Sequence, residues 1–238
     1  MLFSALNVRN KGAHRPGRCR LETLEPRNML SGTPPTVADV NVGSTAWTSD
    51  FIDYLEANSL GTDGYSIPVG SSSQLDPLPW HNLDQIRITF SEDVNVQQSD
   101  MALSGINTTA YEFADFDYDS ATFTATWTLA GNIAGDGLLI DLSGDGLDPV
   151  TDLDSNILDG EWTTSSSTYG SGNGTAGGDF EFRLDVLPGD ASQSGYVSTA
   201  DFSRVWFFRG TDTEDANYNP IYDLDGSGDI GTDDYMFV

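Results

Sequence analysis

Two twelve-residue windows, DASQSGYVSTAD at 190–201 and DLDGSGDIGTDD at 223–234, repeat one pattern of residue types. Each window has oxygen-bearing side chains at positions 1, 3 and 5, a glycine at position 6, a β-branched apolar residue at position 8 and a carboxylate at position 12. Calcium is a hard cation that takes about six to eight oxygen ligands, so a loop that binds it must curl around it. The repeated pattern predicts two calcium loops, named here loop one (190–201) and loop two (223–234).

The spacing gives each position in the two loops a role. Side chains at positions 1, 3, 5 and 12 supply oxygens, the carbonyl at position 7 adds another, and Gly195 or Gly228 permits the sharp turn at position 6. We expect the apolar residues at position 8, Val197 and Ile230, to pair the loops across a short β-bridge. The predicted calcium ligands are Asp190, Ser192, Ser194, the Tyr196 carbonyl and Asp201 in loop one, and Asp223, Asp225, Ser227, the Asp229 carbonyl and Asp234 in loop two.

The paired loops resemble a dockerin type I module. Dockerins carry aspartate at position 12 and lack the full entering helix of ordinary EF-hands, and Asp201 and Asp234 match this pattern. The resemblance implies an EF-hand-like module over 188–238 that holds two calcium ions and binds a cohesin domain, usually within polysaccharide-degrading assemblies. The sequence departs from the family in the serines of loop one, in a long acidic link (211–219) and in a short segment after loop two (235–238).

In dockerins the exiting helix of each loop, together with loop positions 10 and 11, contacts the cohesin. The resemblance therefore assigns partner binding to Thr199, Ala200, Trp206 and Arg209. The apolar residues after loop one spread over more than one stripe of the expected helix. Two alternatives follow: an exposed aromatic patch that binds a partner, or a helix whose aromatic side chains are all buried.

The charge of the chain is unevenly distributed. Residues 1–32 have a net charge of +4. Because the whole chain has a net charge of −27, residues 33–238 have a net charge of −31, and they contain four arginines and no lysine. Such a surface repels phosphate backbones and anionic lipids, so we expect no nucleic-acid partner. No apolar run reaches the length of about 18 residues that a membrane helix needs, so we expect no membrane insertion.

Residues 1–32 are expected to be an export-associated leader outside the fold. The segment LETLEPRNMLSG at 21–32 resembles the LEPR-XLL leader of many bacterial exported proteins. This resemblance implies an extracellular or cell-surface location, and the alternative is a disordered basic tail. The single cysteine, Cys19, lies in this segment, so residues 33–238 can form no disulfide.

Alternation of apolar and polar residues predicts a mostly β fold over 33–187. This alternation is typical of half-buried antiparallel strands, and about seven or eight short strands fit an Ig-like β-sandwich. The segment IRITFSEDV at 86–94 resembles a strand of bacterial Ig-like domains. Helical spacing after a Ser/Asp cap predicts one helix over 49–58. The apolar positions of the expected strands lie at 38–42, 65–69, 86–90, 111–113, 123–129, 138–142 and 180–184.

Two further patterns in the sandwich region have a functional and a structural interpretation. Asp152, Asp154 and Asn156 imitate half a calcium loop, but an acidic turn between strands explains them as well. The tryptophans Trp47, Trp80, Trp127 and Trp162 form either a stacking platform for sugars or part of the core.

We expect no enzyme. The sequence has no G-x-S-x-G elbow, no histidine pair for zinc after residue 32 and no glycine-rich phosphate loop opening a helix. The expected function is that of an exported, non-catalytic calcium-binding protein that attaches or assembles at the cell exterior. The alternatives are a carbohydrate-binding accessory protein and a structural module whose calcium sites only stabilise the chain.

Overall fold

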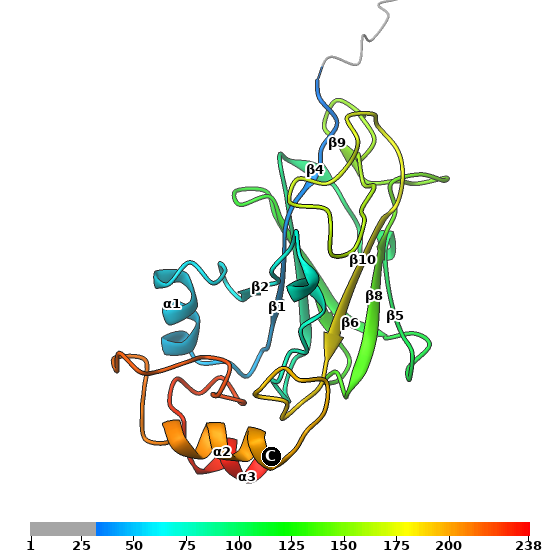
Figure 1. Cartoon of the computed structure of the whole chain (residues 1–238). Helices are drawn as coiled ribbons and strands as arrows, with labels where there is room; N and C mark the ends of the chain where they lie inside the picture. Colours follow the sequence, from blue (N-terminus) through cyan, green and yellow to red (C-terminus); the bar gives the residue numbers. More distant parts are fainter. Residues whose placement is uncertain (1–31) are drawn as a thin grey trace, which may run out of the picture.

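The computed structural model describes residues 32–238, so the predicted leader lies almost entirely outside the described residues. The fold is mostly β, as predicted, and all pairs of named strands in the described part are antiparallel. Two sheets pack as a β-sandwich over a common hydrophobic core. A small module with two helices lies at one end of the sandwich, and the short strands β4 and β9 lie at the other end (Figure 1).

The larger sheet has five strands and the core lies on one of its faces. The register pairs Ile86 with Trp127 and Ile88 with Ala125, and all four side chains are fully buried. Their polar neighbours on the same strands are only partly buried, which is the expected alternation of a half-buried sheet. The strand order is β2 (Tyr65–Ser66), β1 (Val37–Gly43), β3 (Gln85–Phe90), β7 (Thr124–Leu129) and β6 (Phe113–Asp119).

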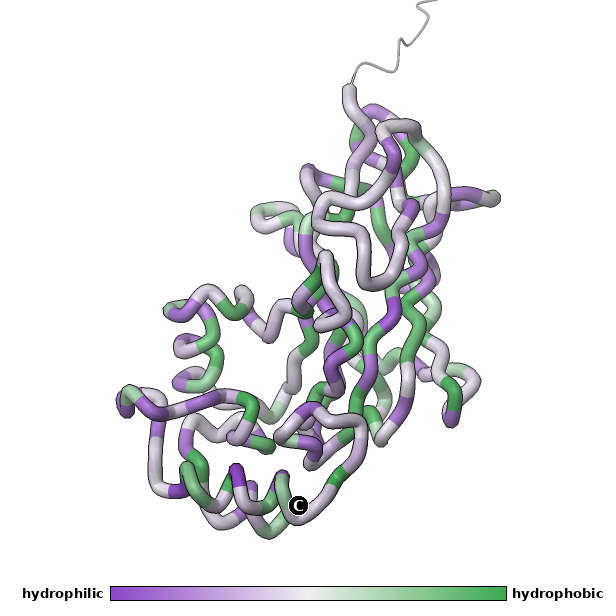
Figure 2. Tube along the Cα trace, in the orientation of Figure 1, coloured by the Kyte–Doolittle hydropathy of each residue, from purple (hydrophilic) through white to green (hydrophobic). Residues whose placement is uncertain are grey.

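The smaller sheet has three strands in the order β10 (Phe180–Val186), β8 (Asp136–Leu142) and β5 (Met101–Gly105). Hydrophobic and hydrophilic residues alternate along β10 (Figure 2), whereas in β8 it is burial that alternates, because Leu138, Leu139 and Ile140 are three consecutive apolar residues. Ile140 pairs with Phe182 on one side and Leu103 on the other, so three apolar side chains cross this sheet on the core face. A separate two-stranded sheet joins β4 (Val94–Asn95) to β9 (Thr151–Asp152).

The helices are few and short. The predicted helix at 49–58 is α1 (Ser49–Ala57), which buries Phe51 and Leu55, although its N-cap is Thr48 and not a Ser/Asp pair. The module contains α2 (Thr199–Phe208) and α3 (Thr232–Phe237), which follow the two loops. Single 3₁₀ turns occur at Ser72–Leu75 and Gln98–Asp100. In the part that the structure describes, no helix is long and apolar enough to cross a membrane.

The sandwich tryptophans belong to the core, and a sugar-stacking platform made of them is therefore wrong. Trp80 and Trp127 are fully buried and Trp47 is 7% exposed. Trp162 is partly buried, and its ring lies 5.4 Å from the ring centres of both Phe180 and Phe182. Large aromatic side chains supply much of the buried apolar area of a core, which explains their place here.

The acidic segment at 152–156 is a turn in which the Asp152 carboxylate accepts hydrogen bonds from other residues of the same turn. Asp152 Oδ1 accepts hydrogen bonds from the backbone N–H groups of Asp154 (2.9 Å) and Asn156 (2.7 Å). Its Oδ2 accepts one from Nδ2 of Asn156 at 2.6 Å. The structural interpretation of this segment is therefore the one that fits.

The module (188–238) packs directly on the sandwich (33–187). The Trp80 indole N–H donates to the carbonyl of Pro220 at 3.2 Å, and the His81 ring stacks on Phe237 at 4.4 Å between centres. Buried residues of the module such as Leu224 and Ile230 belong to the same hydrophobic cluster as the sandwich core. The short connection through 187–189 predicts that the two parts touch, and this is confirmed.

Candidate metal centre

Loop two brings three carboxylates together. Asp223, Asp225 and Asp234 each offer an oxygen, and these oxygens all lie within 4.8 Å of one another. Asp223 is fully buried and Asp234 is 1% exposed. The two other predicted ligands are adjacent, because the Ser227 hydroxyl donates to the Asp229 carbonyl at 3.0 Å. The structure thus gathers the three carboxylates of loop two, and it places the Ser227 hydroxyl beside the Asp229 carbonyl.

The first carboxylate of loop two is oriented by the loop backbone. Asp223 accepts hydrogen bonds from the N–H groups of Ser227 (3.1 Å) and Gly228 (2.8 Å). Gly228 has a φ of +92°, a conformation that glycine adopts without steric cost, and this turn directs its N–H at the carboxylate. The predicted role of the glycine at position 6 is therefore confirmed in loop two.

The last carboxylate of loop two joins the loop to its exiting helix. Asp234 Oδ1 accepts from the Leu224 N–H at 2.6 Å, and Oδ2 accepts from the Gly231 N–H at 2.7 Å, at the start of α3. A carboxylate in the first turn of a helix satisfies N–H groups that have no partner inside the helix. The position-12 side chain therefore closes the loop and begins the helix at once.

The buried carboxylates of loop two have raised pKa values. Burial, with a contribution from the charge of Asp234, raises the pKa of Asp223 to about 7. Burial, with a contribution from the charge of Asp225, raises the pKa of Asp234 to about 6. Like charges held together away from water favour the protonated form, and a cation at the same place would favour the ionised form.

Loop one repeats this arrangement with fewer charges. Asp190 accepts from the N–H groups of Ser194 (3.0 Å) and Gly195 (2.7 Å), and Gly195 has a φ of +86°. Asp201 accepts from the N–H groups of Ser192 and Ser198, both at 2.8 Å. The loops are therefore similar in backbone as well as in sequence, although serines stand at positions 3 and 5 of loop one.

The remaining predicted ligands of loop one also lie together. The Ser192 hydroxyl donates to Asp190 at 3.2 Å, and the Ser194 hydroxyl donates to the Tyr196 carbonyl at 3.1 Å. Although burial opposes it, hydrogen bonds from Ser192 and Ser198 lower the pKa of Asp201 below its usual value. Loop one offers two carboxylates where loop two offers three.

The predicted β-bridge between Val197 and Ile230 is wrong. The N–H of Ile230 donates to the Thr211 carbonyl at 2.9 Å, and its carbonyl accepts from the Gly210 N–H at 2.8 Å. Gly210 has a φ of +86° directly after α2, so the chain turns back there and runs beside loop two. The segment after α2 therefore takes the pairing position that we expected Val197 to fill.

The donor chemistry of loop two fits calcium. Carboxylates, a serine hydroxyl and a backbone carbonyl are the oxygen ligands that a hard divalent cation takes. The buried pair Asp223 and Asp234 has only N–H and hydroxyl partners among the hydrogen bonds that the described residues make. Buried charges in proteins are normally paired with an opposite charge or coordinate a metal, so these two residues fit a cation site.

One contributor to this site was not identified from the sequence. The Tyr218 hydroxyl donates to Asp223 Oδ2 at 2.6 Å, and Tyr218 is 5% exposed. Burial and the neighbouring charge of Asp223 raise the pKa of Tyr218 above its ordinary value. Tyr218 lies in the acidic link between the loops, where no motif indicates a role for a tyrosine.

The residues assigned to partner binding all lie at the surface. Thr199, Ala200 and Arg209 are exposed, and Trp206 is 40% exposed. The Arg209 guanidinium lies over the Trp206 ring at 3.8 Å from its centre. The alternative in which all aromatic residues of this helix are buried is wrong, because Phe207 is 77% exposed, whereas Val205 is buried.

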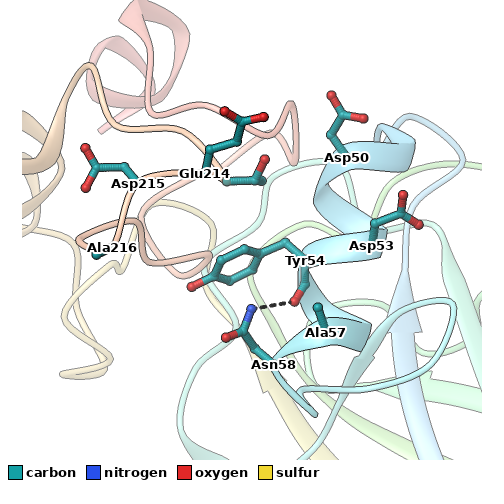
Figure 3. A pocket seen from close by; sticks show the side chains of 9 residues that line it. Asp50, Asp53, Tyr54, Ala57, Asn58, Glu214, Asp215 and Ala216 are labelled. Carbon is teal, nitrogen blue, oxygen red and sulfur yellow. Dashed lines mark hydrogen bonds between the residues drawn. The ribbon is translucent and has the colours of Figure 1, made fainter.

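An acidic pocket lies between α1 and residues 213–216 (Figure 3). It has a volume of about 620 Å³, and Asp50, Asp53, Glu214 and Asp215 line it. Asn58 donates to the Tyr54 carbonyl at its edge, at 2.9 Å. An acidic lining alone does not define a ligand.

Comparisons with known proteins give a distant likeness. No protein-family model matches the sequence, and no curated protein matches it. Solved structures that match include the N-terminal part of the bacterial S-layer protein SbsC (13% identity, TM-score 0.28) and domains 1–6 of surface layer protein SbsC (15% identity, TM-score 0.29). Each match covers 44% of this chain. The matched region is 21% of the first of these structures and 12% of the second. A likeness of this size says nothing about the function of this chain.

Proposed function

We propose that this chain is an exported, non-catalytic calcium-binding protein whose C-terminal module attaches it to a protein partner in a calcium-dependent way. The observation that carries the proposal is the cluster of Asp223, Asp225 and Asp234, whose oxygens lie within 4.8 Å of one another. Loop one supports it, because the backbone arrangement around Asp190 and Asp201 repeats that of loop two.

Calcium has a clear energetic role in this proposal. The ion supplies the positive charge that the buried carboxylates lack, and its binding to the folded form alone stabilises that form by mass action. The module has about fifty residues, a size at which a hydrophobic core by itself is marginal. Calcium therefore holds the loops, and through Asp201 and Asp234 the starts of α2 and α3, in the conformation that a partner recognises.

The proposed attachment surface is the exposed apolar patch on α2 and α3. Trp206 lies 5.9 Å from Phe202 in a stacked arrangement and 4.9 Å from Tyr235 in an edge-on one, between ring centres. Tryptophan and arginine are frequent anchors of protein interfaces, and here Arg209 covers the Trp206 ring. Exposed large apolar side chains gather on the module: Tyr196, Val197, Phe202, Trp206, Phe207, Met236 and Phe237.

The resemblance to dockerins makes a cohesin-like domain the proposed partner. The link to polysaccharide degradation belongs to that family, and it extends here only to the assembly that a cohesin-like partner would form. The proposed exterior location follows from the LEPR-type leader and from the strongly acidic composition of residues 33–238. A sugar-binding role is not proposed, because the sandwich tryptophans are used in the core.

The proposal is tested by calcium calorimetry on the chelator-stripped full chain. We expect calcium binding at two sites in the wild-type chain. Asp223→Ala should remove the site at loop two, and Asp190→Ala should remove the site at loop one. The matched control is Asp117→Ala, which removes an exposed carboxylate from β6, outside the module, and should leave calcium binding unchanged. If the wild-type chain releases no heat and takes up no calcium, the proposed function is wrong.

A further inference from the structure

We infer that the sandwich forms the outer wall of the loop-two calcium site, with Thr48 and Asn82 as positioning residues that hold the loop in its ion-binding shape. This inference rests on the proposed calcium binding. Neither residue lies in the module, and neither was assigned a role from the sequence. The ligands would come from loop two, while the sandwich would determine how well those ligands are arranged.

Four consecutive carbonyl groups of loop two accept hydrogen bonds from the sandwich. They belong to positions 2 to 5 of the loop, the stretch between its first ligand and the turn at Gly228. The donors are two backbone N–H groups and two side chains. The bonds are His81 N–H to Leu224 at 3.2 Å, Asn82 Nδ2 to Asp225 at 2.6 Å, Thr48 N–H to Gly226 at 3.0 Å and Thr48 Oγ1 to Ser227 at 2.9 Å.

Asn82 is itself held in one orientation. Its Oδ1 accepts from the Trp47 indole N–H at 3.1 Å, so its Nδ2 is directed at the carbonyl of Asp225. Asn82 is 7% exposed, and so is Trp47. Asp225 is the position-3 ligand, and a fixed carbonyl on this residue limits the directions in which its side chain can point.

Trp47 also explains the glycine at position 4 of loop two. A Cβ added to Gly226 would lie 2.1 Å from Cδ1 of Trp47, a distance that excludes any side chain. The equivalent position in loop one is Gln193, which has a φ of +57°, close to the +67° of Gly226. The loop backbone therefore accepts a side chain at position 4, and contact with the sandwich removes the space for one in loop two.

Helix α1 also contacts the link that precedes loop two. The Tyr54 hydroxyl donates to the carbonyl of Tyr218 at 3.2 Å, and the two rings lie 4.7 Å apart, edge to face. Tyr218 in turn donates its hydroxyl to Asp223 at 2.6 Å. Because Thr48 is the N-cap of α1, the same helix holds the middle of the loop at its start and the first ligand through Tyr54.

Loop one has much less contact with the sandwich. Among the described residues, the side-chain hydrogen bond between loop one and the sandwich is that of Gln193 Nε2 with the Pro77 carbonyl at 3.3 Å. Tyr196 is 65% exposed and Val197 is 42% exposed. Any effect that acts through the sandwich should therefore be smaller at loop one than at loop two.

Residues that orient metal ligands without touching the metal commonly change its affinity. Their loss typically lowers metal affinity by about 10- to 100-fold. By thermodynamic linkage, calcium at loop two must stabilise the contact with the sandwich by the same factor. Calcium would then fix the module on the sandwich as well as fold its loops.

The test is calorimetry on the full chain carrying Asn82→Ala or Thr48→Val, with Asp190→Ala present so that loop two alone binds. We expect calcium affinity to fall about 10- to 100-fold in both variants. Thr48→Ser keeps the hydroxyl and should restore affinity. Asn95→Ala is the matched control, because Asn95 donates Nδ2 to the Asp152 carbonyl at 3.0 Å, at the far end of the sandwich.

If Asn82 and Thr48 have a merely structural role, their variants should lose thermal stability but keep a loop-two calcium affinity close to that of the Asn95→Ala control. That result would overturn the inference. Amide hydrogen exchange on the unmodified chain gives a second test, which does not depend on whether a variant folds. Calcium should slow exchange at the α1 amides of Phe51 and Leu55. Calcium uptake at loop two with unchanged exchange in α1 contradicts the inference, whereas absence of uptake contradicts the proposed function.

Discussion

The Tyr218 hydroxyl donates a 2.6 Å hydrogen bond to Oδ2 of Asp223, and both side chains are buried. This bond joins the link between the two loops to the first predicted ligand of loop two. Hydrogen bonds to charged groups are stronger than neutral ones, and a buried carboxylate that loses such a bond is left undersatisfied. The relationship makes Tyr218 part of the site, although it would not itself bind the ion.

We expect Tyr218→Phe to weaken calcium binding at loop two by about 10- to 100-fold, since a hydrogen bond to a charged group contributes about 1.5–3 kcal/mol. Loop one should be unaffected. Tyr111→Phe is the control, because it removes a hydroxyl that donates to Asp136 at 2.9 Å in the sandwich. Equal calorimetric affinities for Tyr218→Phe and the wild-type chain would show that the bond does not contribute to the site.

The two loops should differ in affinity. Loop two has Asp223, Asp225 and Asp234 as charged ligands, whereas loop one has Asp190 and Asp201. Affinity in such loops rises with the number of charged ligands. In calorimetry, Asp223→Ala should therefore remove the tighter site and Asp190→Ala the weaker one. Loss of the weaker site in Asp223→Ala would reverse the ranking.

Calcium affinity at loop two should fall as the pH falls. Asp223 and Asp234 have pKa values of about 7 and about 6 in the ion-free protein, and calcium binds the ionised carboxylates. Between about pH 7.5 and about pH 5 the apparent affinity should fall by roughly a hundredfold or more, with protons released on binding. A calorimetric enthalpy that does not depend on the ionisation enthalpy of the buffer would contradict this.

The stability of the ion-free module should change with pH in the opposite direction. A carboxyl whose folded-state pKa is raised stabilises the fold below its unfolded value near about 4, and this contribution is lost as the pH rises through about 6 and 7. The chelated chain should therefore melt at a higher temperature near about pH 5 than near about pH 7.5. Calcium should reverse the order, and the same order in both states would contradict the assignment.

Trp206→Ala should abolish calcium-dependent capture of the partner without lowering calcium affinity. Trp206 packs on Phe202 and Tyr235. Among the described residues, its side chain makes no hydrogen bond to a predicted ligand of either loop. The control is Ile106→Ala, because Ile106 is 83% exposed on the sandwich. If capture survives, or if calcium binding falls with it, Trp206 is a packing residue.

Sequence periodicity predicted the regular strands well and the irregular ones poorly. The clear alternation of Ile86, Ile88 and Phe90 corresponds to β3, and that of Leu138, Ile140 and Leu142 to β8. Strand β5 was not predicted, since only Met101 and Leu103 alternate before Gly105 ends the strand. Short strands carry too few residues for the period to be recognised.

The ligands of the candidate site follow from sequence, but their surroundings do not. The spacing from Asp223 to Asp234 is local, so one loop contains the whole pattern. Thr48 and Asn82 lie more than 140 residues away along the chain, and only the packing of the module on the sandwich brings them to the loop. The same packing explains why Trp80 is buried, since its indole contacts Pro220.

Equilibrium dialysis of the chelator-stripped full chain against calcium tests the central claim most directly. The account predicts two calcium ions per chain at saturation, one in either Asp223→Ala or Asp190→Ala, and none in the double variant. Uptake of no calcium by the wild-type chain, or equal uptake by the wild-type chain and the double variant, would contradict it.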